Sequence, residues 1–224
     1  MKIDEITKLF NLGRPIIEDK GNPYLYLAKK YNFTNYRLIS SGELLVRGKD
    51  LDIPEYVKQF MKFNNEALMI ANIMNNKVIS IVFRNLSGKK EFMKLGITKS
   101  TFYGLGQLDE NFKYGDPILL VEGHLDRDRM SLIFKNTLGV MTNSLSESQA
   151  NILKLMTDKV YLMLDNDEAG KIGTLKSKKL LKDIYVREIN HDSRLKDAGD
   201  LVKLEMENHY DLKFLEDYYR MQLA

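Results

Sequence analysis

Residues 117–123 read PILLVEG, and residues 160–167 read VYLMLDND. Each stretch is a short apolar run that ends in carboxylates, which are Glu122 in the first stretch and Asp165 with Asp167 in the second. Continuous apolar runs of this length are typical of strands buried on both faces of a parallel sheet. The two stretches therefore predict two buried strands, each followed directly by acidic side chains.

Helical patterns alternate with apolar runs through the second half of the chain. A helix is expected at about 126–135, and a capping box from Ser146 to Gln149 opens another. A third helix is expected at about 169–184, followed by a strand at 186–189. Strands that alternate with helices favour an α/β fold whose sheet is mainly parallel and flanked by helices.

The first half of the chain has an α+β pattern. Segment 67–84 alternates around Asn75-Asn76 and is rich in β-branched residues, which predicts a β-hairpin. Residues 35–53 are expected to form a strand–turn–strand unit with its turn at Ser40-Ser41-Gly42. Pro54 fits the first turn of a helix. The remaining expected elements are helices at 3–10 and 24–31 and a strand near 91–93.

The boundary between the halves is expected in a glycine-bearing polar stretch, residues 104–115. An amphipathic helix is also expected near the end of the chain, at about 203–222. We therefore expect three regions. They are an α+β region over 1–110, an α/β region over 111–205 and a helical tail over 206–224.

The composition excludes several kinds of protein. The chain has no cysteine and only three histidines, which excludes disulfides and argues against a zinc site. A net charge of +3 permits a nucleic-acid partner without requiring one. The N-terminus lacks the apolar core of a signal peptide, and no stretch reaches the ~18–20 apolar residues of a membrane helix. We expect a soluble, cytoplasmic protein with no membrane partner.

A third acidic group follows the strand expected at 186–189, and it consists of Asp197 and Asp200. In an open parallel sheet the carboxyl ends of the strands share one edge, where ligands bind. The sheet can therefore gather these carboxylates with those that follow the first two strands. Mg²⁺ prefers such oxygen ligands and keeps several waters and substrate phosphates. The alternative is that residues 165–170 form only an N-cap and an acidic first helical turn.

LLVEGHLD, residues 119–126, and YLMLDNDEAG, residues 161–170, resemble the two signatures of the Toprim domain. The resemblance implies a metal site that holds Mg²⁺ or Mn²⁺, with no zinc. Residues 196–201 are similar to the loop that follows the next strand in primases, although Asp197-Ala198-Gly199 replaces the Asp-Pro-Asp of many bacterial members. The catalytic residues implied are Glu122, Asp126, Asp165 and Asp167. The metal ligands implied are Glu122, Asp165, Asp167 and Asp197.

The first half resembles the segment that precedes the Toprim domain in DnaG-type primases. The features that match in order are ISSG after the helix at 24–31, the hairpin, KKEF at 89–92 and FYGL at 102–105. The resemblance implies a small primase catalytic core, of phage type, without zinc-binding and helicase-binding domains. Such an enzyme makes short RNA primers from nucleoside triphosphates on single-stranded DNA. Its partners would include a replicative helicase or a separate template-recognition protein.

Four basic residues are candidates for contacts with the nucleic acid or nucleotide, since Lys and Arg neutralise phosphates. They are Arg84, Lys89, Lys90 and Lys94. The alternative is a solvated strand edge, where lysine discourages aggregation. Two other functions stay open for the whole chain. They are a Toprim nuclease, which uses the same carboxylates for hydrolysis, and a replisome accessory subunit that binds nucleic acid and needs a partner for activity.

Overall fold

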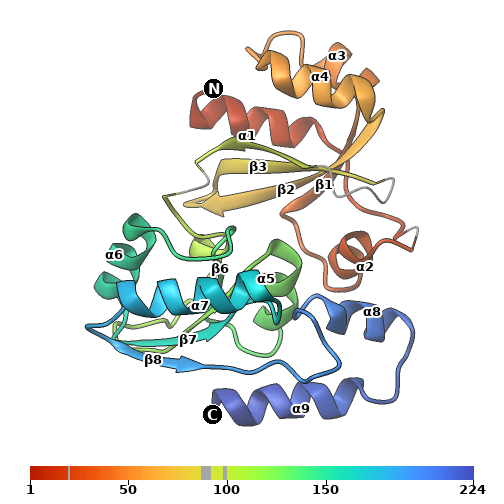
Figure 1. Cartoon of the computed structure of the whole chain (residues 1–224). Coiled ribbons are helices and arrows are strands. Elements are labelled where there is room, and N and C mark those ends of the chain that lie inside the picture. The colour runs from red at the N-terminus through yellow and green to blue at the C-terminus, as the bar shows by residue number, and fades with distance from the viewer. Residues whose placement is uncertain (20, 87–91, 98–99) are drawn as a thin grey trace. The chain divides into compact units, whose positions relative to one another are not determined.

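The computed structural model describes residues 1–19, 21–86, 92–97 and 100–224, without the side chain of Phe92 (Figure 1). The chain forms two compact units, Met1–Thr98 and Lys99–Ala224. This division lies ahead of the boundary expected at residue 110, because the segment from Thr101 already packs within the second unit. Gln149, for example, donates a hydrogen bond of 2.8 Å to the Thr101 carbonyl. Among the described residues, no helix is long and apolar enough to span a bilayer.

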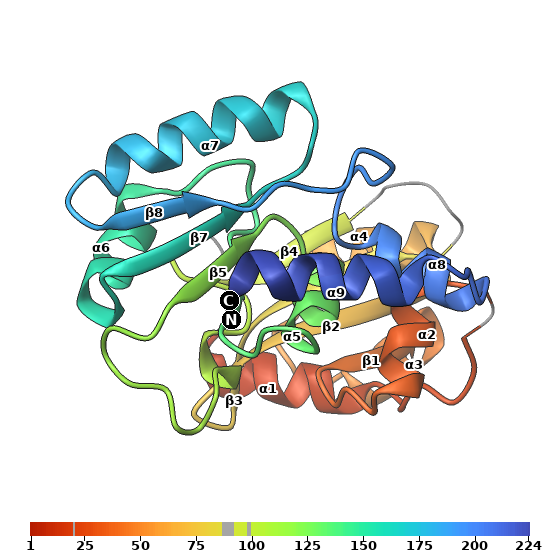
Figure 2. The same ribbon diagram turned by 90° about the horizontal axis from the view of Figure 1, so that it is seen from below.

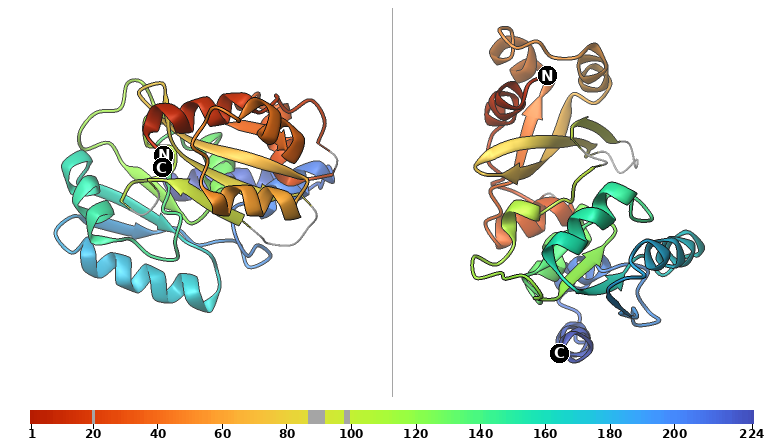
Figure 3. Two further views of the ribbon diagram at one scale, coloured as in Figure 1. Left: turned by 90° about the horizontal axis from the view of Figure 1, so that it is seen from above. Right: turned by 90° about the vertical axis from the view of Figure 1, so that its left-hand side faces the viewer.

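The first unit is built on an antiparallel sheet with the strand order β1-β2-β3-β4. Helices α1, α3 and α4 lie across one side of this sheet (Figure 3). The strands are β1 (Tyr36–Ser40), β2 (Glu66–Met74), β3 (Lys77–Asn85) and β4 (Phe92–Gly96). The helices are α1 (Ile3–Leu12), α2 (Pro23–Lys30), α3 (Ser41–Arg47) and α4 (Glu55–Phe63).

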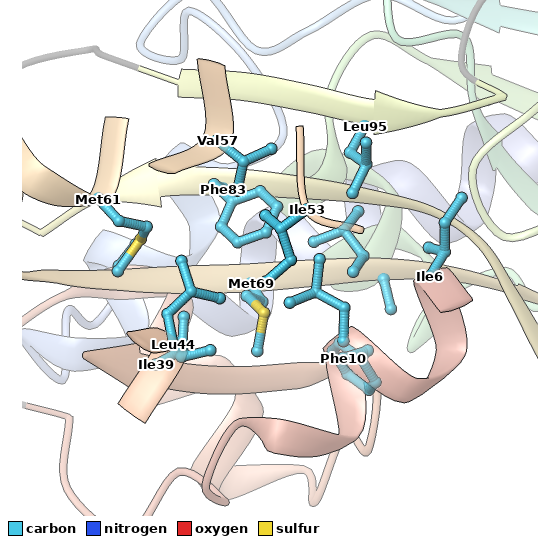
Figure 4. Packing of buried hydrophobic residues seen from close by; sticks show 14 of the residues in the cluster. Ile6, Phe10, Ile39, Leu44, Ile53, Val57, Met61, Met69, Phe83 and Leu95 are labelled. Carbon is cyan, nitrogen blue, oxygen red and sulfur yellow. The ribbon is translucent and has the colours of Figure 1, made fainter. Parts of the chain in front are cut away.

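Alternate residues of the strands point to this helical layer and form the core of the unit. Met69 and Phe83 from the sheet contact the side chains that α1, α3 and α4 bury (Figure 4). Among those are Phe10, Leu44 and Met61, none more than 4% exposed. The predicted hairpin is confirmed. Asn75 and Asn76, both at positive φ, form the two-residue turn between β2 and β3.

The strand–turn–strand unit expected over 35–53 is wrong in its second half. Only β1 forms, and α3 replaces the expected turn and second strand. The cause is a capping box, in which Ser40 Oγ accepts from the amide of Glu43 and the Glu43 carboxylate accepts from the amide of Ser40. A serine followed three residues later by glutamate thus begins a helix where Ser-Ser-Gly suggests a turn.

The second unit is built on a parallel sheet with the strand order β6-β5-β7-β8. This confirms the expected α/β arrangement with a mainly parallel sheet. The strands are β5 (Ile118–Val121), β6 (Thr137–Gly139), β7 (Lys159–Met163) and β8 (Tyr185–Glu188). The helices are η1 (Leu105–Gln107), α5 (His124–Ser131), α6 (Glu147–Met156), α7 (Glu168–Leu180), α8 (Asp200–Met206) and α9 (Leu212–Leu223).

Helices cover both faces of this sheet, and α7 and α9 lie on opposite sides of it (Figures 1 and 2). Ile118 and Leu120 of β5 contact the core beneath α6 and α7, whereas Leu119 and Val121 contact the core beneath α5, α8 and α9. All four side chains are fully buried. Burial on both faces explains why β5 and β7 are continuous apolar runs.

Helix α9, which lies in the region expected as a helical tail over 206–224, packs on the sheet as part of the second unit. A buried cation joins it to two other helices. Arg129 of α5, 1% exposed, forms an ion pair with Glu205 of α8 at 3.4 Å and a second one with Glu216 of α9. Arg129 of this charged helix thus points inward, because carboxylates from two further helices form ion pairs with it.

Arg129→Ala removes the cation that Glu205 and Glu216 share, and we expect it to lower the free energy of unfolding by about 3–5 kcal/mol. Urea denaturation followed by circular dichroism measures the change. The matched control is Arg194→Ala, which breaks half-exposed pairs with Asp192 and Asp211. It should cost less than about 1 kcal/mol. Equal losses in the two variants would contradict the role given to Arg129.

Candidate active site

The candidate site lies at the carboxyl ends of β5 and β7, which pair in parallel at the middle of the sheet. The chain leaves β5 for β6 on one side and returns to form β7 on the other. In open α/β sheets, ligands bind in the crevice outside the strand ends where the strand order reverses in this way. Glu122 directly follows β5, and Asp165 and Asp167 follow β7. The fold therefore places the three predicted carboxylates at the ends of two neighbouring strands.

Asp167 is the N-cap of α7. Its Oδ1 accepts a hydrogen bond of 3.0 Å from the amide of Gly170, and this bond is the main reason that its pKa lies below the usual value. The glycine is required, because a Cβ at position 170 would stand 2.0 Å from the Asp165 carbonyl oxygen. The N-cap interpretation and the metal interpretation of Asp167 are therefore compatible, since the cap uses one of its two carboxylate oxygens.

Negative charge accumulates at the crevice. Burial, followed by the charges of Asp165 and Asp167, raises the pKa of Glu122 to about 7. Burial, followed by the charge of Asp197, also raises the pKa of Asp165. Burial and the charges of neighbouring aspartates thus disfavour the ionised forms of Glu122 and Asp165, and a cation beside them would relieve both effects.

Lys196, in the loop after β8, supplies one such cation. Its Nζ lies 3.5 Å from Oδ2 of Asp165 and 3.4 Å from Oδ2 of Asp167. Burial lowers the pKa of Lys196, but the charges of the two aspartates outweigh this effect and leave the pKa raised. The amide of Asn166 donates to the Lys196 carbonyl at 2.8 Å, so the β7 and β8 loops are tied together. The sequence analysis did not predict this ion pair, because its partners come from two loops about thirty residues apart.

Asp126 has a different place from the other carboxylates. It is partly buried, and its two oxygens accept from the amides of Gly123 at 2.9 Å and Gly199 at 2.7 Å. Burial, with the charges of Asp197 and Asp165, raises its pKa to about 7. Asp126, expected among the catalytic residues, therefore joins the loop after β5 to the loop after β8.

The two carboxylates of the loop after β8, Asp197 and Asp200, have different contacts. Asp200 begins α8, pairs with Lys203 and accepts from the amide of Lys196 at 2.9 Å. Asp197 accepts from the Asp200 amide at 3.0 Å, and its charge raises the pKa of both Asp165 and Asp126. Asp197 is therefore the carboxylate of this loop that acts on the crevice.

The donor set fits a magnesium ion held by few protein ligands. Within the described parts of the chain, no three histidine, aspartate or glutamate side chains are close enough to form a three-ligand site as they stand. Mg²⁺ is usually bound through one or two carboxylates, with waters and substrate phosphates completing its shell. Asp165 and Asp167 meet that requirement, because both already contact one cation, the Lys196 ammonium.

A network missed by the sequence analysis supports the helix that follows Glu122. Tyr103 donates a hydrogen bond of 2.7 Å to Asp128, which also pairs with Arg127 at 2.8 Å. Gly104, at a φ of +87°, leaves room for the Arg127 guanidinium. The ring of His124 meets the Tyr103 ring edge-on at 4.6 Å. The FYGL stretch thus anchors the start of α5, and neither His124 nor Tyr103 is open to solvent.

The predicted basic residues belong to the first unit. Arg84 lies on β3, with its guanidinium 4.5 Å from the centre of the Tyr24 ring, and Lys94 lies on β4. Lys89 and Lys90 lie outside the described residues. The structure adds an aromatic group on and near α2, which the sequence analysis missed. Lys30 stands 5.3 Å and 5.6 Å from the rings of Tyr26 and Tyr31.

Comparison with known proteins agrees with this geometry. Residues 119–202 match the family model described as Toprim-like. The DNA primase of Clostridium acetobutylicum is 26% identical over 181 residues, which are 78% of this chain and 28% of the relative. The crystal structure of the Aquifex aeolicus primase, with its zinc-binding and RNA polymerase domains, has a TM-score of 0.69 at 17% identity and covers 99% of this chain and 62% of the other.

The E. coli primase catalytic core has a TM-score of 0.65 at 13% identity, over 96% of this chain and 79% of that one. The second unit therefore contains a Toprim-like domain. The chain as a whole has the fold of a DnaG-type primase catalytic core, as the sequence resemblance implied. It spans less than a third of the length of the clostridial primase that it matches.

The raised pKa of Glu122 predicts that Mg²⁺ affinity increases with pH. Below a pH of about 7 Glu122 is protonated in the folded protein, and its negative charge appears as the pH rises through that value. Calorimetric titration with Mg²⁺ at pH 6 and pH 8 should show tighter binding at pH 8. Glu122→Gln should weaken binding at pH 8 and reduce this dependence. Affinity in the unaltered protein that does not change with pH would contradict the prediction.

Asp126→Asn should destabilise the second unit, because an amide oxygen cannot accept from both Gly123 and Gly199 as the carboxylate does. The expected loss is about 1–3 kcal/mol in the free energy of unfolding at pH 8. Urea denaturation measures it, and the exposed Asp217→Asn serves as the control with little expected change. A variant as stable as the control would mean that Asp126 does not join the two loops.

Proposed function

We propose that the chain is a DNA primase catalytic core that synthesises short RNA primers on single-stranded DNA. The observation that carries this proposal is the placing of Glu122, Asp165 and Asp167 at the reversal point of a Toprim-like sheet. The fold of the whole chain supports the choice among Toprim activities, because the first unit also matches primase catalytic cores. The structure of a DnaG primase catalytic domain bound to single-stranded DNA also has this fold.

In the proposed reaction, the 3′-hydroxyl oxygen of one nucleotide forms a bond to the α-phosphorus of the next, and pyrophosphate leaves. Asp165 and Asp167 would hold the magnesium ion, with Glu122 and Asp197 completing the acidic environment. The ion, Mg²⁺ or Mn²⁺, would neutralise charge on the triphosphate. Glu122, with a pKa near neutrality, is suited to accept the proton that the attacking hydroxyl loses.

Lys196 has a second task in this proposal. Its ammonium neutralises Asp165 and Asp167 before substrate arrives, and it stands beside the place where the triphosphate would bind. With a divalent cation bound to the two carboxylates, Lys196 would be free to contact a phosphate oxygen. An exposed side chain of this length can make that movement without a change in the backbone.

The template would bind to the first unit. Arg84 and Lys94 offer charge for its phosphates, and the tyrosines of α2 offer rings on which bases stack.

We also propose that the reaction takes place in the cytoplasm, where template and nucleotides are present. A nuclease that uses the same carboxylates is the second candidate, because hydrolysis makes the same demands on the metal and the phosphate.

Asp167→Asn should abolish primer synthesis without unfolding the protein. Asparagine is as good an N-cap as aspartate, so α7 keeps its cap while the crevice loses a charge. The assay contains single-stranded DNA, labelled ribonucleotides and Mg²⁺ or Mn²⁺. Short labelled products are expected from the unaltered chain, and at least about a hundredfold less from the variant if about 3 kcal/mol of transition-state stabilisation is lost.

The matched control is Asp183→Asn, at an exposed aspartate that pairs with Lys154 on the surface. It should retain full activity. Full activity in Asp167→Asn would refute the proposed metal site. A template that is shortened without any synthesis would refute primer synthesis in favour of the nuclease.

A further inference from the structure

A groove lies between α3 and α4 in the first unit, outside the site already described. Its volume is about 620 Å³, which is in the range of sites that bind a ligand or a peptide segment. Leu44, Ile53 and Met61 form its floor and are each at most 4% exposed. The same three side chains belong to the packed core of the unit (Figure 4).

The walls of the groove are unusual for a soluble surface. Leu45 of α3 lines it and is 71% exposed. The buried floor therefore continues into an exposed apolar wall. A hollow with an apolar floor and an exposed apolar wall is a place where another molecule can bind.

The rim of the groove carries positive charge. Lys49, Lys58 and Lys62 line it, against the single carboxylate of Glu55. Lys58 and Lys62 stand one turn apart on α4, so they point along the same side of the groove. All three lysines are exposed, and in the part of the chain that the structure describes no carboxylate forms an ion pair with them.

An apolar floor between basic rims fits one kind of partner best. We propose that this groove binds an amphipathic, acidic helix from a partner protein. The apolar stripe of such a helix would lie on Leu44, Ile53 and Met61, as in other helix-in-groove complexes. Its glutamates or aspartates would pair with the lysines of the rim, which sets the choice of partner by charge. A nucleic-acid backbone would use the lysines but would leave the apolar floor in contact with water.

A pair of designed peptides tests this inference on the full chain. The first is a helical peptide of about sixteen residues with leucines spaced i, i+3, i+4, i+7 and glutamates on the flanking positions. The second has lysine in place of every glutamate. Fluorescence anisotropy should show that the acidic peptide binds at least about tenfold more tightly than the lysine peptide, since charge complementarity separates them.

The double variant Lys58→Glu with Lys62→Glu should reverse this preference, because the rim then repels glutamate. Leu45→Asp should weaken both peptides by removing apolar contact. The matched control is Lys8→Glu, at an exposed lysine of α1 outside the groove, which should leave both affinities unchanged.

Three results would overturn the inference. They are the absence of binding by the acidic peptide up to millimolar concentration, equal binding of the two peptides, and a preference that the rim variant does not alter. Concentration-dependent dimerisation that Leu45→Asp abolishes, with no peptide binding, would show that a second copy of the chain covers the groove. Primer synthesis is measured on the same variants and should not change, so this test is independent of the proposed function.

Discussion

The burial of several carboxylates at the ends of β5 and β7 is the constraint around which the site of the second unit is built. Parallel pairing of these strands brings Glu122 to the same sheet edge as Asp165 and Asp167. Burial first, and then the charges of neighbouring aspartates, raise the pKa values of Glu122 and Asp165. The fold tolerates this charge because Lys196 pairs with both aspartates and because Asp126 fixes the loops around them. Such a cluster of buried carboxylates favours the binding of a divalent cation.

Much of the second unit could be predicted from local sequence. The runs before Glu122 and Asp165 are apolar because β5 and β7 are buried on both faces, so the strands and the positions of their carboxylates follow directly. The task of Asp126 could not be predicted, since its bond to Gly199 crosses the sheet edge between loops far apart in sequence. The inward position of Arg129 was equally hidden, because its carboxylate partners come from helices much later in the chain.

The first unit was harder to predict. Its hairpin has a strong local signal in Asn75-Asn76, and the structure confirms the predicted hairpin. The start of α3 was not predicted, because Ser40 and Glu43 form a capping box within residues that also suit a turn. The aromatic group on α2 was missed because tyrosines spread along a helix show no pattern of their own. Both misses lie where the binding surfaces of this unit are proposed, so function here depends on tertiary contacts more than on motifs.

The most direct test of the account is a crystal structure of the chain with Mn²⁺, whose anomalous scattering locates the ion. The expected result is one strong anomalous peak at the crevice, from a Mn²⁺ ion bound by carboxylate oxygens of Asp165 and Asp167. The Lys196 ammonium should have moved away from both aspartates. A crevice without a peak at a Mn²⁺ concentration that supports activity, with Lys196 still paired to the two aspartates, would contradict it.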